Sequence, residues 1–99
     1  MDIIEIKKKL NANVNHIKKK FQVKEIGIFG SFTKGGHFIH EDSDIDILVS
    51  FHKGHKDFFN YMRLKYYLEN LLGKEVDLVI KDAVKPRLKE KIFNEVQYV

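Results

Sequence analysis

Residues 26–51 read IGIFGSFTKGGHFIHEDSDIDILVSF, and this stretch decides how the rest of the chain is organised. An apolar run ends at Gly30 and Ser31, a polar loop follows, and a second apolar run opens with Asp44 and Asp46. Successive side chains of a strand point to opposite faces. Asp44 and Asp46 are therefore expected on one face of a strand, with Cα atoms roughly 6.6 Å apart.

Two carboxylates at this spacing can converge on a hard divalent cation such as Mg²⁺. Gly30 allows the backbone to approach a ligand closely, and Ser31 adds a hydroxyl and an N–H group. The two strands would thus bring groups that cradle a phosphate next to groups that hold a metal. This combination predicts a site for a nucleoside triphosphate.

A third carboxylate strengthens the prediction. Asp77 interrupts the otherwise apolar run of residues 76–80. Such a residue is costly in a strand unless it is exposed, paired or bound to a metal. If this strand lies beside the one that begins near Asp44, three carboxylates share one surface, and a divalent cation would relieve their repulsion.

Other motifs are weaker. The loop has the glycine spacing of a Walker A loop but lacks the Lys-Ser/Thr pair that must follow it, and the chain contains no G-x-G fingerprint. The pairs His37-x-x-His40 and His52-x-x-His55 could bind zinc. Both pairs fall in predicted loops, so solvated side chains are the favoured interpretation.

Hydrophobic spacing predicts the remaining elements. The expected order is a helix over about residues 2–20, a strand over 23–29, a helical turn over 31–35, a loop over 37–43, a strand over 44–51, a helix over 57–72, a strand over 75–80 and a helix over 86–96. This order indicates a small α/β (α+β) domain, in which a mixed sheet of three or more strands is covered by helices.

Local signals mark the ends of the helices. Asp2 and Asp57 are expected to cap helices, Gly73 to end one, and Pro86 to occupy a first helical position. The expected buried side chains of the last two helices are Phe58, Met62, Leu68 and Leu72, and then Leu88, Ile92, Phe93 and Val96.

Composition limits the class of protein. The 99 residues predict one domain, residues 1–99, and the chain contains no cysteine and no apolar run of the roughly 20 residues that a membrane span needs. No secretory signal is recognised, so the cytoplasm is expected. The formal net charge of the chain is +4, and residues 1–24 carry seven lysines. A solvated helix face is the favoured interpretation, and a surface for nucleic acid or for an acidic partner remains an alternative.

The pattern of Gly30, Ser31, Asp44, Asp46 and Asp77 resembles the polymerase-β-like nucleotidyltransferases. The short length and the ending KPRLKEKIFNEVQYV look like the minimal nucleotidyltransferases, in particular the MntA-like antitoxins that are paired with HEPN-domain toxins. The sequence departs from that family in two ways. The spacer between Ser31 and Asp44 is longer than is usual, and Lys34 stands where Arg is common.

The resemblance implies a polymerase-β-like fold and a defined reaction. Such proteins bind ATP with Mg²⁺, two ions during catalysis, and transfer AMP to a hydroxyl with release of pyrophosphate. For an MntA-like antitoxin the acceptor is a Tyr of the HEPN toxin. By the same resemblance Asp44 and Asp46 would hold the metal, Asp77 would help to place a second metal or act as general base, and the nucleotide would contact Gly30, Ser31 and Lys34.

Two other functions remain open from the sequence. The chain could be a non-catalytic antitoxin that only covers its toxin, although pure binding needs none of the carboxylates. It could also transfer nucleotides to RNA, for which the basic N-terminal helix is the supporting feature. These readings differ in where a labelled AMP would be found: on neither molecule, on RNA, or on a partner protein.

Overall fold

The structure, a computed structural model, describes residues 3–30 and 44–99. The elements in these ranges follow the predicted order and add two short ones. They are α1 (Ile3–Lys20), β1 (Val23–Phe29), β2 (Ile45–Phe51), α2 (Phe58–Leu72), β3 (Val76–Ile80), the 3₁₀ helix η2 (Lys81–Ala83), α3 (Pro86–Glu95) and β4 (Gln97–Tyr98). The predicted cap Asp2, the turn over 31–35 and the loop over 37–43 lie outside the described residues.

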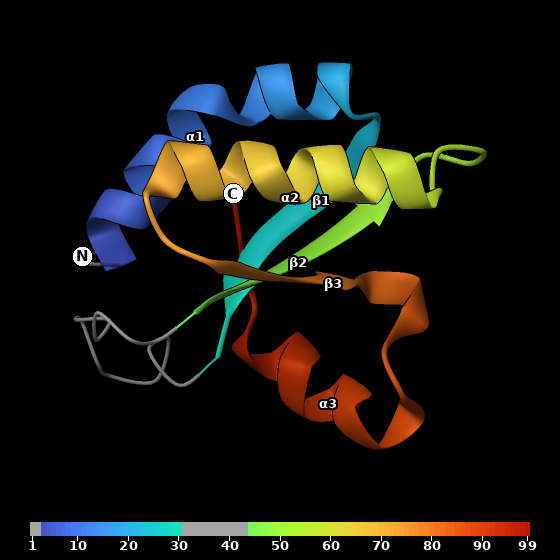
Figure 1. Ribbon diagram of the computed structural model, residues 1–99. Helices are drawn as coiled ribbons and strands as arrows, with labels where there is room; N and C mark the ends of the chain where they lie inside the picture. The colour runs from blue at the N-terminus through green and yellow to red at the C-terminus, as the bar shows by residue number, and fades with distance from the viewer. Residues whose placement is uncertain (1–2, 31–43) are drawn as a thin grey trace.

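The sheet has four strands in the order β3-β2-β1-β4. β1 is antiparallel to both β2 and β4, whereas β2 and β3 are parallel, so the sheet is mixed. Figure 1 shows α1 and α2 over one face of this sheet and α3 over the other. The predicted α+β class is therefore confirmed. The parallel pairing of β2 and β3 also meets the condition under which the strand aspartates share one surface.

The main core lies between the sheet and the helices α1 and α2. Ile45, Ile47 and Val49 of β2 point into it and are at most 1% exposed, as their alternation with the aspartates predicts. Alternation places Asp46 and Leu48 on the opposite face, where Leu48 packs in a second, smaller cluster with Phe29 and Val84. α3 covers this second face.

Helix α2 begins and ends as predicted. The Asp57 carboxylate accepts a hydrogen bond from the Asn60 backbone N–H at 2.9 Å, which satisfies one of the free donors of the first turn. Gly73 has a φ of 68°, and its N–H donates to the Glu69 carbonyl at 2.8 Å. A residue with a β-carbon would be strained in this left-handed conformation, so glycine suits the end of the helix.

One expectation for α2 is wrong. Phe58 is 70% exposed rather than buried. The buried face of α2 follows a strict four-residue step through Asn60, Leu64, Leu68 and Leu72. Phe58 lies two positions before the start of that row and so points away from the sheet, whereas the predicted burial of Leu68 and Leu72 is confirmed.

Helix α3 packs less tightly than its apolar stripe predicts. Pro86 occupies its first turn, as expected, and Ile92 and Val96 pack against the second cluster. Leu88 and Phe93 remain 41% and 38% exposed. The apolar spacing predicts all four as core residues, but a helix that lies alone on one face of a sheet buries only a narrow stripe.

The short β4 was not predicted, since two residues leave no alternation to recognise. It pairs with Gly27 and Ile28 of β1. A β-carbon on Gly27 would lie 2.7 Å from Val96 Cγ2 and 2.9 Å from the Gln97 carbonyl oxygen. Glycine at this position therefore allows the end of α3 and β4 to lie directly on β1.

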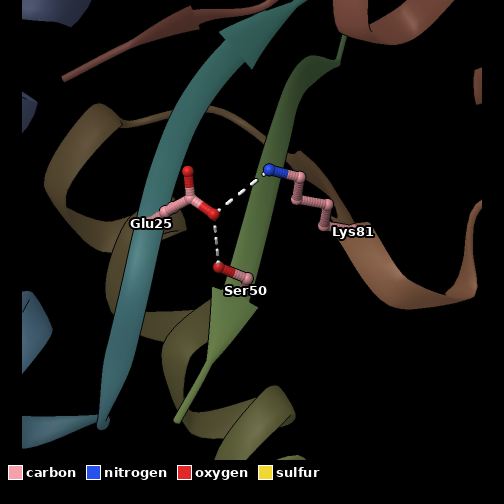
Figure 2. Close-up of polar contacts among 3 residues, drawn as sticks. All are labelled: Glu25, Ser50 and Lys81. Carbon is pink, nitrogen blue, oxygen red and sulfur yellow. Dashed lines mark hydrogen bonds and ion pairs between the residues drawn. The ribbon is translucent and has the colours of Figure 1, made fainter. Parts of the chain in front are cut away.

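A polar cluster joins three elements at the end of the sheet away from Asp46 (Figure 2). Lys81 Nζ lies 3.1 Å from Glu25 Oε1, and the Ser50 hydroxyl donates to the same oxygen at 3.3 Å. The ammonium also lies 5.5 Å from the ring centre of Phe93 and 5.4 Å from that of Tyr98. Lys81 thereby connects β1 and β2 with the segment that carries α3 and β4.

None of the helices in residues 3–30 and 44–99 is both long enough and apolar enough to cross a membrane.

Candidate active site

The parallel pairing of β2 and β3 brings two of the three predicted carboxylates together. Asp46 and Asp77 are direct partners in the register, and they lie on the face that α3 covers. Asp46 is partly buried and Asp77 is exposed. Asp44, also exposed, lies just before β2 begins. The three residues therefore come to one end of the sheet, as the sequence predicts.

The pKa of Asp46 reflects how close the other carboxylates lie. Burial, the largest cause, and the nearby charges of Asp77, Asp44 and Glu95 together raise the pKa of Asp46 to about 6. Burial acts because a charge loses its hydration, and the neighbours act because like charges repel. Burial and the neighbouring like charges thus both disfavour the ionised form of Asp46.

A pocket of about 320 Å³ opens at this end of the sheet. Gly30 and Asp46 line it together with residues of β1 and α3, namely Phe29, Leu88, Lys91, Ile92 and Glu95. Two larger hollows, of about 580 and 420 Å³, lie along the outer side of α3 and between α1 and the last residues of the chain. Neither is lined by a strand aspartate, so chemistry rather than size identifies the candidate site.

The structure describes some of the other predicted site residues and not others. Gly30 follows β1 with a φ of 112°, a conformation that favours glycine, and it lines the same pocket as Asp46. Ser31 and Lys34 lie outside the described residues, so their contacts with a nucleotide stay predictions. Of the four histidines in the proposed zinc pairs, His52 and His55 are exposed as expected. His37 and His40 lie outside the described ranges.

The donor set fits Mg²⁺ in its chemistry. Carboxylate oxygens are the ligands this ion prefers, and Mg²⁺ commonly uses one or two of them together with water and substrate phosphates. Within residues 3–30 and 44–99, no three histidine, aspartate or glutamate side chains are gathered closely enough to form a complete cage. The described side chains by themselves would therefore supply only part of the ligands of a cation at Asp46.

Sequence reasoning missed the contribution of α3. Its pocket-lining side chains were predicted as core (Leu88 and Ile92) or left unassigned (Lys91 and Glu95). A signal was present, since these four positions share one helix face at steps of three and four residues. A mixed apolar and charged face of this kind is unusual for a helix that only packs on a sheet.

Comparison with known proteins yields one family and close relatives. The family model described as "Nucleotidyltransferase domain" matches residues 6–99. The protein adenylyltransferase MntA of Thermococcus cleftensis is 41% identical over 95 residues, which cover 96% of this chain and 93% of the relative. A solved structure of a candidate minimal nucleotidyltransferase is 34% identical, with a TM-score of 0.81 over 98% of this chain and 95% of that one.

A more distant solved structure contains a tri-AMPylated HEPN toxin of Shewanella oneidensis in complex with an MNT antitoxin. The aligned chain is 20% identical, and the match has a TM-score of 0.65 over 94% of this chain and 70% of that one. At this identity the likeness concerns the fold.

Proposed function

The chain belongs to the nucleotidyltransferase domain family and is an enzyme of nucleotidyltransferase type, and from this premise we propose that it is a protein adenylyltransferase that acts as an antitoxin. Its substrate is ATP with Mg²⁺, and its acceptor is a hydroxyl, that of a Tyr, on a HEPN-domain toxin. The observation that carries the proposal is the pairing of Asp46 with Asp77 beside a pocket that Gly30 also lines.

In this proposal Asp44 and Asp46 hold Mg²⁺, with Asp77 contributing to a second ion. When bound, the metal supplies neutralisation of triphosphate charge and lowers the pKa of the attacking hydroxyl. The acceptor oxygen forms a bond to the α-phosphorus of ATP, the bond between that phosphorus and the bridging oxygen breaks, and pyrophosphate leaves. Where Asp77 acts as general base instead of placing the second ion, its carboxylate takes the proton of the acceptor hydroxyl; otherwise that proton passes to water. Gly30, Ser31 and Lys34 orient the phosphates.

The relatives support the choice of acceptor. The Thermococcus relative is named as a protein adenylyltransferase, and the Shewanella complex pairs an AMPylated HEPN toxin with its antitoxin. We propose further that residues 1–99 form one domain that works in the cytoplasm. In the proposal the partner protein presents the acceptor hydroxyl.

Co-expression with the HEPN-domain protein of the same genome tests the function. Intact-mass spectrometry of the partner should show one or more AMP adducts, and peptide mapping should place them on Tyr. Growth should recover when the wild-type chain is present. Growth recovery with an unmodified partner would favour an antitoxin that acts by binding alone, and AMP found on RNA instead would favour transfer to RNA.

A further inference from the structure

One face of α3 forms the wall of the pocket opposite the strand residues. Leu88, Lys91, Ile92 and Glu95 stand at steps of three and four residues, which align side chains along one side of a helix. All four line the pocket that also contains Phe29, Gly30 and Asp46. This wall of the pocket is therefore one continuous face of α3.

Packing alone does not account for this wall. Leu88 is 41% exposed and is not part of either buried cluster, whereas Ile92 is partly buried and packs against the smaller one. An exposed leucine by itself is ordinary. Here it stands in a pocket beside a second apolar side chain, one turn along the same helix, and Lys91 lies between them in sequence. The pocket therefore offers an apolar surface and a cation on the same wall.

A nucleotide matches this combination of surfaces. Its base and ribose present flat, largely apolar area, and its phosphates carry the negative charge that a lysine ammonium binds. Asp46 and the carboxylates near it repel phosphates that carry no metal ion. A cation on the facing wall is therefore more important for the phosphates that the metal does not neutralise.

We propose that α3 is the nucleotide-binding wall of the site, with Leu88 and Ile92 in contact with the base or ribose of Mg–ATP and Lys91 in contact with its phosphates. This inference rests on the proposed function and adds the residues that recognise the substrate. Glu95, whose charge reaches Asp46, lies at the metal side of the same wall.

The test uses the full chain in Mg²⁺ with three probes: ATP, inorganic tripolyphosphate and adenosine. Calorimetry measures the first two, and ligand-observed NMR measures the third. Leu88→Ala should weaken ATP and adenosine about tenfold and leave tripolyphosphate unchanged, since it removes apolar contact only. Lys91→Met should weaken ATP and tripolyphosphate about tenfold and leave adenosine unchanged, since it removes a charge-assisted contact.

Lys89→Met is the matched control. Lys89 lies on the same helix, is exposed and does not line the pocket, and its replacement removes the same charge. It should bind all three probes as wild type does, and melting temperatures should confirm that every variant is folded. If wild type binds Mg–ATP and both pocket variants bind it equally well, or if Lys89→Met loses as much as Lys91→Met, the assignment of α3 is wrong. If wild type itself fails to bind Mg–ATP, the proposed function fails first.

Discussion

Asp46 occupies a position where its charge is costly to the fold. It is half-buried on β2, it lies next to Asp77 in the sheet register, and its pKa is raised to about 6 by burial and by neighbouring carboxylates. A strand selected for stability alone would place a neutral residue here. Sites that sacrifice stability in this way are commonly functional ones.

The raised pKa of Asp46 predicts a pH dependence of stability. Between the ordinary value of 3.8 and about 6, the native chain binds a proton at Asp46 more often than the unfolded chain does. The free energy of unfolding of the metal-free protein therefore falls as pH rises through this window. Asp46→Asn should raise the melting temperature in EDTA above pH 6, and the gain should shrink as the pH falls toward 3.8.

Thermal melts of wild type and Asp46→Asn across this range provide the measurement. Asp57→Asn is a control for the loss of an aspartate elsewhere, since Asp57 caps α2 and Asn is also a good cap. A variant that melts at or below the wild-type temperature at neutral pH would show that the Asp46 charge does not oppose folding.

The proposed mechanism predicts that Asp77 affects catalysis more than binding. Asp77 is exposed on the edge strand β3. In this mechanism Asp44 and Asp46 still hold the nucleotide's metal when Asp77 is neutralised. We expect Asp77→Asn to bind Mg–ATP nearly as wild type does but to lose roughly 10²–10⁴-fold in AMP transfer, the usual range for general-base help. Calorimetry and adduct formation on the partner measure the two effects. Equal losses in both would assign Asp77 to nucleotide binding instead.

Among the elements, Gly27 determines how closely α3 and β4 approach the sheet. A β-carbon there would meet Val96 Cγ2 at 2.7 Å and backbone atoms of β4 at 2.9 and 3.1 Å. Gly27→Ala should therefore cost about 1–3 kcal/mol, as over-packing usually does, and should increase amide exchange in β4 and the end of α3. Val96→Ala in the same chain should restore only part of the stability, because the backbone contacts remain. Full restoration by Val96→Ala would contradict this account.

The link between Glu25 and Lys81 predicts a pH dependence of opposite sign. The hydrogen bond from Lys81 lowers the pKa of Glu25 below its ordinary value. The stabilisation is present at neutral pH and is lost as pH falls through the lowered pKa. Because both side chains are partly exposed, Glu25→Gln should cost less than about 1 kcal/mol at neutral pH and nothing in acid. A cost that persists in acid would indicate lost packing rather than lost charge.

The sequence predicts elements well where a local signal is strong. The alternation around Asp44 and Asp46, the cap at Asp57 and the stop at Gly73 each act within a few residues, and the observed elements agree with them. Contacts between distant segments are different. Neither β4 nor the role of Gly27 has a local signal, because both depend on where residues 96–98 return to β1.

The sequence likewise predicts the strand residues of the candidate site but not the part that the last helix contributes. The pairing of Asp46 with Asp77 follows once β2 and β3 are neighbours. The sequence leaves that adjacency as a condition, because it gives the two apolar runs but not the order of the strands in the sheet. The α3 wall was not predicted, because Leu88 and Ile92 look like core residues until the helix is seen to cover the face that carries the aspartates. The predicted burial of Phe58 is wrong because the hydrophobicity of a residue does not determine which face of its helix is buried.

The whole molecule is a mixed sheet with its main core on one face and its candidate site on the other. α1 and α2 stabilise the sheet from one side, while α3 and the ends of β1, β2 and β3 form the candidate site on the other (Figure 1). This division lets the aspartates tolerate unfavourable electrostatics without disturbing the main core.

The most direct test of adenylyl transfer compares two labels. The chain and its HEPN-domain partner are incubated with Mg²⁺ and ATP labelled at either the α- or the γ-phosphate, with Asp46→Asn as the control. We predict that the α label alone appears on the partner, that EDTA abolishes it, and that Asp46→Asn transfers little or none. Label from the γ-phosphate, or a partner that is neutralised without any label, would contradict the account.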